Sequence, residues 1–163
     1  LLFESECKKN NVRVTKKLAE LPEISGDAGQ LSQAFVNIIK NGIEAMQDKG
    51  GELIVKTDLG EVIKLGKIRR QGTMKGDEMV WGEEEEMGKP IPVVFTEITD
   101  TGDGISEENL KSLFDPFFTT KMTGTGMGLP ITLRIIEEHK GSIKVRSQKG
   151  KGTTFIITLP QRL

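Results

Sequence analysis

The stretch that decides the fold is residues 100–129, DTGDGISEENLKSLFDPFFTTKMTGTGMGL. It follows a run of apolar and β-branched residues at 92–99 (PVVFTEIT), which predicts a buried strand. Within the stretch, a short helix with a serine N-cap is expected over 107–114. A loop over 115–128 then leads into a second helix over 129–140. A carboxylate at the end of a buried strand and a glycine-rich loop at the start of a helix both suggest a ligand site.

Three glycines alternate in the segment GTGMG at 124–128, directly before the second helix. Successive backbone N–H groups together with a helix N-terminus form an anion site, so this loop is a candidate phosphate-binding loop. It is not a Walker A loop, because GxxxxGK[ST] occurs nowhere in the chain. It is not a dinucleotide-binding GxGxxG turn either, because a loop precedes it where that motif needs a strand.

The carboxylate at the end of the strand is Asp100, which opens the segment DTGDG. Glycines at such a position let the backbone approach a ligand closely. The carboxylate can accept a hydrogen bond from an exocyclic amine such as N6 of adenine. The alternative is an ordinary strand-to-helix turn, in which Asp and Gly are both common.

A long helix is expected over 28–48, with Asp27 as its N-cap. Asn37 and Asn41 are four residues apart and share a face, and Glu44 continues the same line. The face is either solvated or functional. Asn is a mediocre helix former, whereas its amide oxygen is a suitable Mg²⁺ ligand and its NH₂ group can donate to phosphate. The apolar residues at helical spacing form a buried stripe on the opposite side. They are Leu31, Ala34, Phe35, Ile38, Ile39, Ala45 and Met46.

The remaining elements mix helices and strands. A helix is expected over 1–9, and strands are expected from Val12 and over 52–57, 142–147 and 153–159, the last two joined by a tight turn. Residues 58–92, with a basic half and an acidic run, form an excursion that is either a β-hairpin or a loop. The order of these helices and strands along the chain predicts an α/β fold, a two-layer sandwich of a mixed sheet and about three helices. We expect it to form a single domain over 1–163.

Composition excludes several classes of protein. The chain has 163 residues and a net charge of −1, which gives no electrostatic case for a nucleic-acid partner. No apolar run approaches the ~18 residues that cross a bilayer, so no membrane contact is expected of this chain. The lone Cys7 excludes an internal disulfide and a cysteine metal cluster, which fits a cytoplasmic location. The first residues resemble the end of a helix, so we expect a fragment of a longer protein.

In this order and spacing, the motifs resemble the N, G1, F and G2 boxes of the sensor histidine kinase catalytic domain, the Bergerat ATP-binding fold of the GHKL superfamily. The resemblance covers residues 26–160, nearly the whole chain. The segments that carry it are QLSQAFVNIIKNGIEAM (30–46), DTGDGI (100–105), LFDPFFTTK (113–121), GTGMGL (124–129) and GKGTTFIITLP (150–160). FTTK at 118–121 and EAM at 44–46 most resemble the nitrogen-regulation-type subgroup.

The resemblance implies ATP and Mg²⁺ as ligands and assigns roles to residues. Asn41 is implied to be the principal Mg²⁺ ligand, with Asn37 supporting the metal and the phosphates. Asp100 is implied to accept from adenine N6, and either Thr153 or Thr154 to reach the same adenine edge. The other implied ATP-binding residues are Gly102, Gly104, Ile105, Lys121, Gly124, Thr125, Gly126, Met127, Gly128 and Leu129. Phe117 and Phe118 are implied to anchor the ATP lid.

Three positions depart from the family pattern. Gly42 stands where Ala usually follows the second Asn, which loosens the helix by up to ~1 kcal/mol. Glu44 replaces a Lys that many members use to contact phosphate. The 58–92 excursion is longer than the usual connection, and the resemblance assigns it no role.

The family transfers the γ-phosphoryl group of ATP to a histidine on a separate dimeric helical domain. His139 is the single histidine here, and it lacks the acceptor context of a His followed by Glu or Asp on a long helix. We therefore expect the acceptor domain to be absent, so that no residue here is assigned as catalytic and the chain binds ATP without phosphorylating itself. The implied partners are that dimerisation domain and, through the longer protein, a response regulator. Whether the longer protein is membrane-anchored stays open.

Relatives of the same fold give two alternatives. Anti-sigma-factor kinases, like the ATPases of this fold, carry a Glu at the position of Asn37, and they lack a well-formed F box. A nucleotide-binding interaction module would signal through lid order without transfer. The intact Asn41, Asp100 and G2 glycines argue against such a degenerate module.

Overall fold

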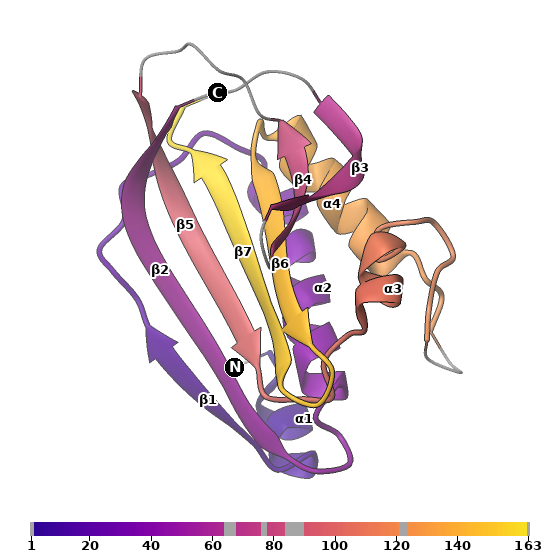
Figure 1. Ribbon diagram of the computed structural model, residues 1–163. Helices are drawn as coiled ribbons and strands as arrows, with labels where there is room; N and C mark the ends of the chain where they lie inside the picture. The colour runs from indigo at the N-terminus through magenta and orange to yellow at the C-terminus, as the bar shows by residue number, and fades with distance from the viewer. Residues whose placement is uncertain (1, 64–67, 76–77, 84–89, 121–123, 163) are drawn as a thin grey trace.

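The computed structural model describes residues 2–63, 68–75, 78–83, 90–120 and 124–162. Within these ranges, the strands form one mixed sheet in the order β1-β2-β5-β7-β6-β4-β3, and the helices lie against one of its faces (Figure 1). The predicted two-layer α/β sandwich is confirmed. The elements are α1 (Glu4–Lys9), β1 (Val12–Lys17), α2 (Ala28–Glu44), β2 (Gly51–Ile63), β3 (Ile68–Lys75), β4 (Glu78–Glu83), β5 (Pro90–Asp100), α3 (Glu107–Lys111), α4 (Gly128–Glu138), β6 (Ser142–Gln148) and β7 (Gly152–Pro160).

Strand pairing places the chain's polar motifs at one end of the sheet. β1 runs parallel to β2, and the other neighbouring pairs are antiparallel. The register sets Leu53 of β2 and Thr153 of β7 on either side of Asp100, the last residue of β5. Because directly paired residues project from the same face of a sheet, these three side chains lie together on the helix-covered face.

The hydrophobic core lies between that face of the sheet and helices α2 and α4. Ile38 of α2, Ile136 of α4 and Ile157 of β7 are each at most 1% exposed. Burying a side chain of this size stabilises the fold by ~1.5–3 kcal/mol, so the two helices are held to the sheet mainly by apolar contact. Within the described ranges, no helix has the length and hydropathy needed to cross a membrane.

Helix α2 begins as the sequence predicts but ends four residues early. The Asp27 carboxylate accepts a hydrogen bond of 2.8 Å from the Gln30 N–H, which confirms the N-cap. The predicted end at residue 48 is wrong, because the helix ends at Glu44. Beyond it, i to i+3 hydrogen bonds replace the helical pattern, starting with Met46 N–H to the Ile43 carbonyl at 3.1 Å.

The 58–92 stretch contains the hairpin rather than a loop. β2 and β5 extend into it from both sides and pair as far as Ile63 and Pro90. Between them, β3 and β4 pair antiparallel, and β4 adds to the sheet beside β6. Met79 of β4 lies opposite Val145 and is 2% exposed, so this extension shares the core.

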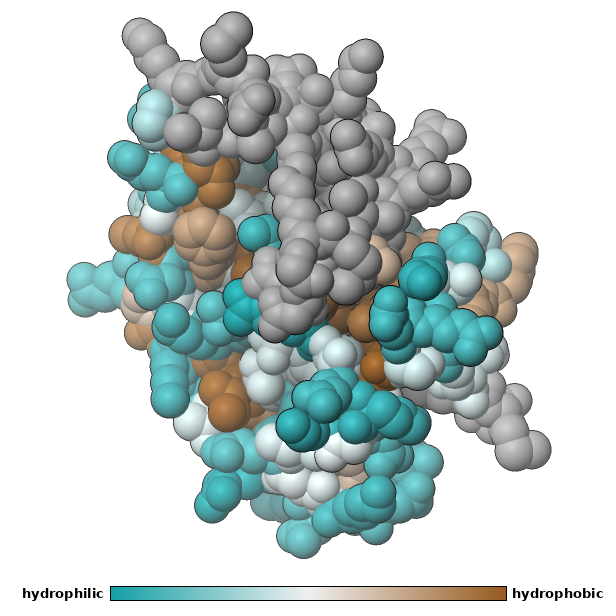
Figure 2. Space-filling model, in the orientation of Figure 1, coloured by the Kyte–Doolittle hydropathy of each residue, from teal (hydrophilic) through white to brown (hydrophobic). Residues whose placement is uncertain are grey.

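None of the described helices covers the opposite face of the sheet, and this face is chemically mixed. Figure 2 shows brown patches separated by teal side chains over β2 and β5. One apolar contact on this face joins Phe95 to Gly60, where an added Cβ would lie 2.4 Å from the ring. The aromatic ring therefore covers a glycine that contributes no side chain of its own.

His139 joins the end of α4 to the start of α2. Its Nδ1 lies 2.7 Å from the Ile135 carbonyl, and its Nε2 accepts a 2.9 Å hydrogen bond from the Asp27 N–H. A carbonyl requires a donor and an amide N–H requires an acceptor, so the ring is neutral with its proton on Nδ1. The side chain is 5% exposed. A helix-end position was predicted for it, but its role as a buried link between two helices was not.

Replacing His139 should therefore destabilise the whole domain. We expect His139→Ala to lower the free energy of unfolding by about 3 kcal/mol, because it opens a cavity and removes the acceptor of the Asp27 N–H. Urea unfolding measures this difference. The control is Arg134→Ala, which removes an exposed ion pair with Glu138 on the same helix and should cost at most ~0.5 kcal/mol. Equal stability of the two variants would contradict the linking role.

Candidate functional site

The candidate site is centred on the Asp100 carboxylate at the end of β5. The side chain is 5% exposed, and its Oδ1 accepts a 2.9 Å hydrogen bond from the Gly102 N–H. Helix α2 approaches it at Gly42, where an added Cβ would lie 3.4 Å from Asp100 Cβ and 2.9 Å from a Leu53 methyl group. The glycine in place of the family's usual alanine therefore lets α2 pack closely against the carboxylate and against Leu53.

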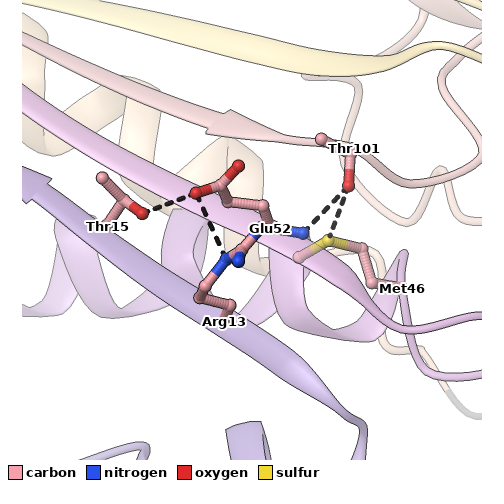
Figure 3. Close-up of polar contacts among 5 residues, drawn as sticks. All are labelled: Arg13, Thr15, Met46, Glu52 and Thr101. Carbon is pink, nitrogen blue, oxygen red and sulfur yellow. Dashed lines mark hydrogen bonds and ion pairs between the residues drawn. The ribbon is translucent and has the colours of Figure 1, made fainter.

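Thr101 fixes the turn that follows Asp100. Its hydroxyl oxygen accepts a 3.0 Å hydrogen bond from the Glu52 N–H and lies 3.6 Å from the sulfur of Met46 (Figure 3). The Glu52 carboxylate is held in turn by Thr15, at 2.5 Å, and by Arg13, at 3.6 Å. The turn is thus tied to β2 and to the segment after α2.

The glycines of the turn are required by close contacts and by backbone conformation. A Cβ on Gly102 would lie 2.5 Å from the Ala45 carbonyl oxygen, so only glycine fits there. Gly104 has a φ of +65°, and an added Cβ would lie 2.0 Å from the Gln148 carbonyl oxygen. The backbone of this turn therefore packs directly against α2 on one side and the β6–β7 turn on the other.

The two threonines that the sequence left as alternatives project from opposite faces of β7. Thr153 pairs with Asp100, is 5% exposed, and has its hydroxyl 2.8 Å from Ser147 Oγ. Thr154 pairs with Thr99 on the helix-free face, with 2.9 Å between the hydroxyls. Only Thr153 shares the face of the Asp100 carboxylate.

Asn37 connects α2 to the first turn of α4. Its Nδ2 donates to the Gly128 carbonyl at 3.1 Å and to Thr132 Oγ1 at 3.3 Å. The Thr132 hydroxyl donates its own proton to the Gly128 carbonyl at 2.9 Å, so both partners of Asn37 act as acceptors. The amide nitrogen must face them, and the amide oxygen faces away. Asn41 lies one turn further along and is half-buried, so neither Asn is on a fully solvated face.

The loop before α4 is tied by its backbone. The Phe117 N–H donates to the Gly126 carbonyl at 3.0 Å, and both residues have a φ of +68°. The Phe117 side chain is 77% exposed, so the anchoring role expected of it is not seen. Phe118 is half-buried, and the fully buried aromatic of this segment is Phe114, at 8% exposure.

The remaining glycine-loop residues are partly open to solvent. Gly124 and Thr125 are exposed, whereas Met127, Gly128 and Leu129 are half-buried. Helix α4 starts after Met127, whose own side chain makes no capping hydrogen bond to the first N–H groups of the helix. Lys121, a predicted site residue, lies outside the described residues.

Sequence reasoning missed two polar residues that organise this site, Thr132 and Ser147. A signal for each was present. Thr132 is a polar residue on the apolar side of α4 and is fully buried. Ser147 follows Ile143 and Val145 at strand spacing, so it continues the inward face of β6. In both cases a small hydroxyl at a core position indicates a buried hydrogen bond.

Comparisons with known proteins place the chain in one family. A family model described as histidine kinase-, DNA gyrase B-, and HSP90-like ATPase matches residues 26–163. The chain is 35% identical over 161 residues to sporulation kinase C of Bacillus subtilis, covering 98% of the chain and 30% of that protein. It is 33% identical over 151 residues to the sensory histidine kinase/phosphatase NtrB of Azospirillum brasilense, covering 92% of the chain and 34% of that protein. The chain thus spans about a third of the length of these curated relatives.

A solved structure shares the fold over the whole chain. The nucleotide-free catalytic domain of histidine kinase ThkA superposes with a TM-score of 0.68 at 26% identity. The match covers 99% of this chain and 86% of that one.

The loop after Asp100 should respond to pH through Asp103. A hydrogen bond from Lys49, 2.9 Å away, and the charge of Lys49 lower the pKa of Asp103 below its ordinary value of 3.8. A lowered pKa means that the contact stabilises the fold above pH 3.8, and that this contribution is lost as pH falls through the lowered value. We expect Lys49→Met to return the pKa to the ordinary range, as measured by NMR titration of the carboxyl carbon.

A matched control is Lys56→Met, which removes an exposed lysine 3.6 Å from Asp58 on β2. It should leave the Asp103 titration unchanged, because the two pairs lie on different segments. An Asp103 midpoint that is the same with and without Lys49 would contradict the contact.

Proposed function

We propose that this chain, which belongs to the family of histidine kinase-, DNA gyrase B- and HSP90-like ATPases, binds ATP and supplies the catalytic domain of a sensor histidine kinase. The observation that carries the proposal is the buried Asp100 carboxylate between Gly42 of α2 and Thr153 of β7. A buried carboxylate beside close-packed backbone is suited to recognise the amino group of a base.

The adenine site consists of Asp100 and Thr153 in this proposal. Asp100 accepts from the exocyclic amine, and Thr153 reaches the same edge of the base. Thr153 is preferred to Thr154 because its hydroxyl shares a face with the carboxylate, whereas the Thr154 hydroxyl bonds to Thr99 on the other face. Gly102, Gly104 and Ile105 form the adjoining wall.

The phosphates are assigned to the loop 124–128 and the N-terminus of α4. The N–H groups at the start of an α-helix favour an anion, the N-cap residue Met127 supplies no competing side-chain acceptor, and the alternating glycines allow a close approach. In this proposal the triphosphate lies beside Asn37 and Asn41 of α2, which the hydrogen bond from Asn37 to the first turn of α4 supports.

Mg²⁺ fits the donor set on α2. Mg²⁺ is commonly held by one or two protein oxygens together with substrate phosphates. The amide oxygen of Asn41, supported by Asn37, is the proposed protein ligand, because both amides lie on α2 near the start of α4. When bound, the ion neutralises phosphate charge. Asn37 keeps its oxygen directed away from α4 through the bonds made by its nitrogen.

The phosphoryl acceptor is assigned to another domain of a longer protein. His139 is 5% exposed and has both ring nitrogens bonded, so it is not accessible to ATP. The curated relatives extend well beyond the matched region, which leaves room for a histidine-bearing domain. The proposed partners are that domain and a downstream response regulator. Position 37 holds an amide that cannot act as a base for water, so efficient hydrolysis of ATP is not expected.

Calorimetric titration with ATP tests the binding site. The unmodified chain should bind ATP, and more tightly with Mg²⁺ present. Asp100→Asn should lower the affinity at least ~10-fold, because it replaces an acceptor with a donor opposite the amine. Asp58→Asn, an exposed carboxylate on β2, is the control and should change nothing. Absence of ATP binding by the unmodified chain would refute the proposal.

Phosphoryl transfer is tested by supplying the acceptor in trans. With radiolabelled ATP, the chain alone should remain unlabelled, whereas an added histidine-bearing dimerisation domain from a sensor histidine kinase should become labelled. Asn41→Ala should abolish that labelling, because the proposed Mg²⁺ ligand is lost. Label on the chain itself in the absence of the added domain would contradict the assignment of the acceptor.

A further inference from the structure

Ser147 lies behind the candidate adenine site and makes three hydrogen bonds through one hydroxyl. Its Oγ accepts from the Ile105 N–H at 2.8 Å and donates to the Gly152 carbonyl at 3.0 Å. It also lies 2.8 Å from the Thr153 hydroxyl, a contact that either oxygen could donate.

Counting protons fixes the direction of the third bond. A serine hydroxyl has one proton to donate and two lone pairs that accept. The Gly152 carbonyl is an acceptor only, so it takes the Ser147 proton, and the Ile105 N–H occupies one lone pair. The remaining lone pair must accept from Thr153. The Thr153 proton is therefore directed at Ser147, and only its lone pairs remain for a ligand.

The resulting pocket edge is made of acceptors. Thr153 lies directly opposite Asp100 in the β5–β7 register, and an ionised carboxylate is also an acceptor only. A 6-amino purine carries two N–H donors at this position. A 6-oxo purine carries a carbonyl oxygen there, which would face the Thr153 lone pairs without a proton between them.

We propose that Ser147 is a positioning residue that sets base specificity: by holding the Thr153 proton, it makes the pocket favour 6-amino over 6-oxo purines. The inference rests on the proposed function, because it concerns the same nucleotide site. It adds to the Asp100 contact a second element of discrimination, which acts through a residue that does not touch the base.

The ratio of affinities for ATP and inosine triphosphate tests this role. Inosine triphosphate differs from ATP in the 6-substituent and the proton on N1, so a structural defect alone should weaken both ligands equally. In Ser147→Ala the Thr153 hydroxyl is free to turn and donate to the 6-oxo group. We expect the ratio measured by calorimetry to fall about tenfold. Ser147→Thr keeps a hydroxyl at this position and should keep the ratio of the unmodified chain.

Two further variants show whether Ser147 acts through Thr153. Thr153→Val removes the hydroxyl and should lower the ratio by a similar factor, and the double variant with Ser147→Ala should lower it no further. Thr99→Val is the matched control, since it removes a hydroxyl pair of similar length on the opposite face, and the ratio should not change.

The outcomes distinguish a failure of the Ser147 inference from a failure of the proposed ATP-binding function. If Ser147→Ala still binds ATP with an unchanged ratio of ATP to inosine triphosphate affinity, the role of Ser147 is refuted, whereas the proposed ATP site is not. An unchanged ratio in Thr153→Val overturns the inference even if Ser147→Ala does not fold. If the unmodified chain binds no ATP, the proposed function fails and the inference fails with it.

Discussion

The hydrogen bonds that join α2 to α4 determine the geometry of the candidate site. At one end the Asp27 N–H is bonded to His139, and at the other the Asn37 amide is bonded to the first turn of α4. Helix α2 carries the amides proposed to hold the metal, and α4 begins with the glycines proposed to hold phosphate. Because α2 is bonded to both ends of α4, these part-buried hydrogen bonds help to set the spacing of the two groups.

The sheet supplies the other half of the site through register and close packing. The pairing of β5 with β7 sets Asp100 opposite Thr153. Glycines then allow the backbone of neighbouring elements to pack closely against Asp100. On Gly152 an added Cβ would lie 2.1 Å from the Asp100 carbonyl oxygen, and on Gly42 it would meet the Asp100 side chain at 3.4 Å. A larger residue at either position would separate the elements that enclose the carboxylate, so the glycines here serve packing as much as turning.

The sequence predicts what depends on local pattern and misses what depends on tertiary bonding. The stripe containing Leu31 and Ile38 identified α2, because periodicity reflects which face of a helix is buried. The end of α2 was misplaced, since the chain leaves the helix to form a turn against β2 and Thr101. The exposure of Phe117 was missed because its backbone, and not its ring, is bonded to the glycine loop.

The identity of residue 37 links this packing to the chemistry of the site. An amide can donate from its nitrogen to the Gly128 carbonyl and to Thr132, and still direct an oxygen away from them. An ionised glutamate at this position has no proton to donate, so in this arrangement the Gly128 carbonyl would face a second acceptor, and a buried mismatch of this kind costs ~1–3 kcal/mol. The contact between α2 and α4 therefore favours an amide over a water-activating carboxylate. In this chain the proposed preference for transfer over hydrolysis is therefore supported by the packing of the two helices as well as by the absence of a carboxylate at position 37.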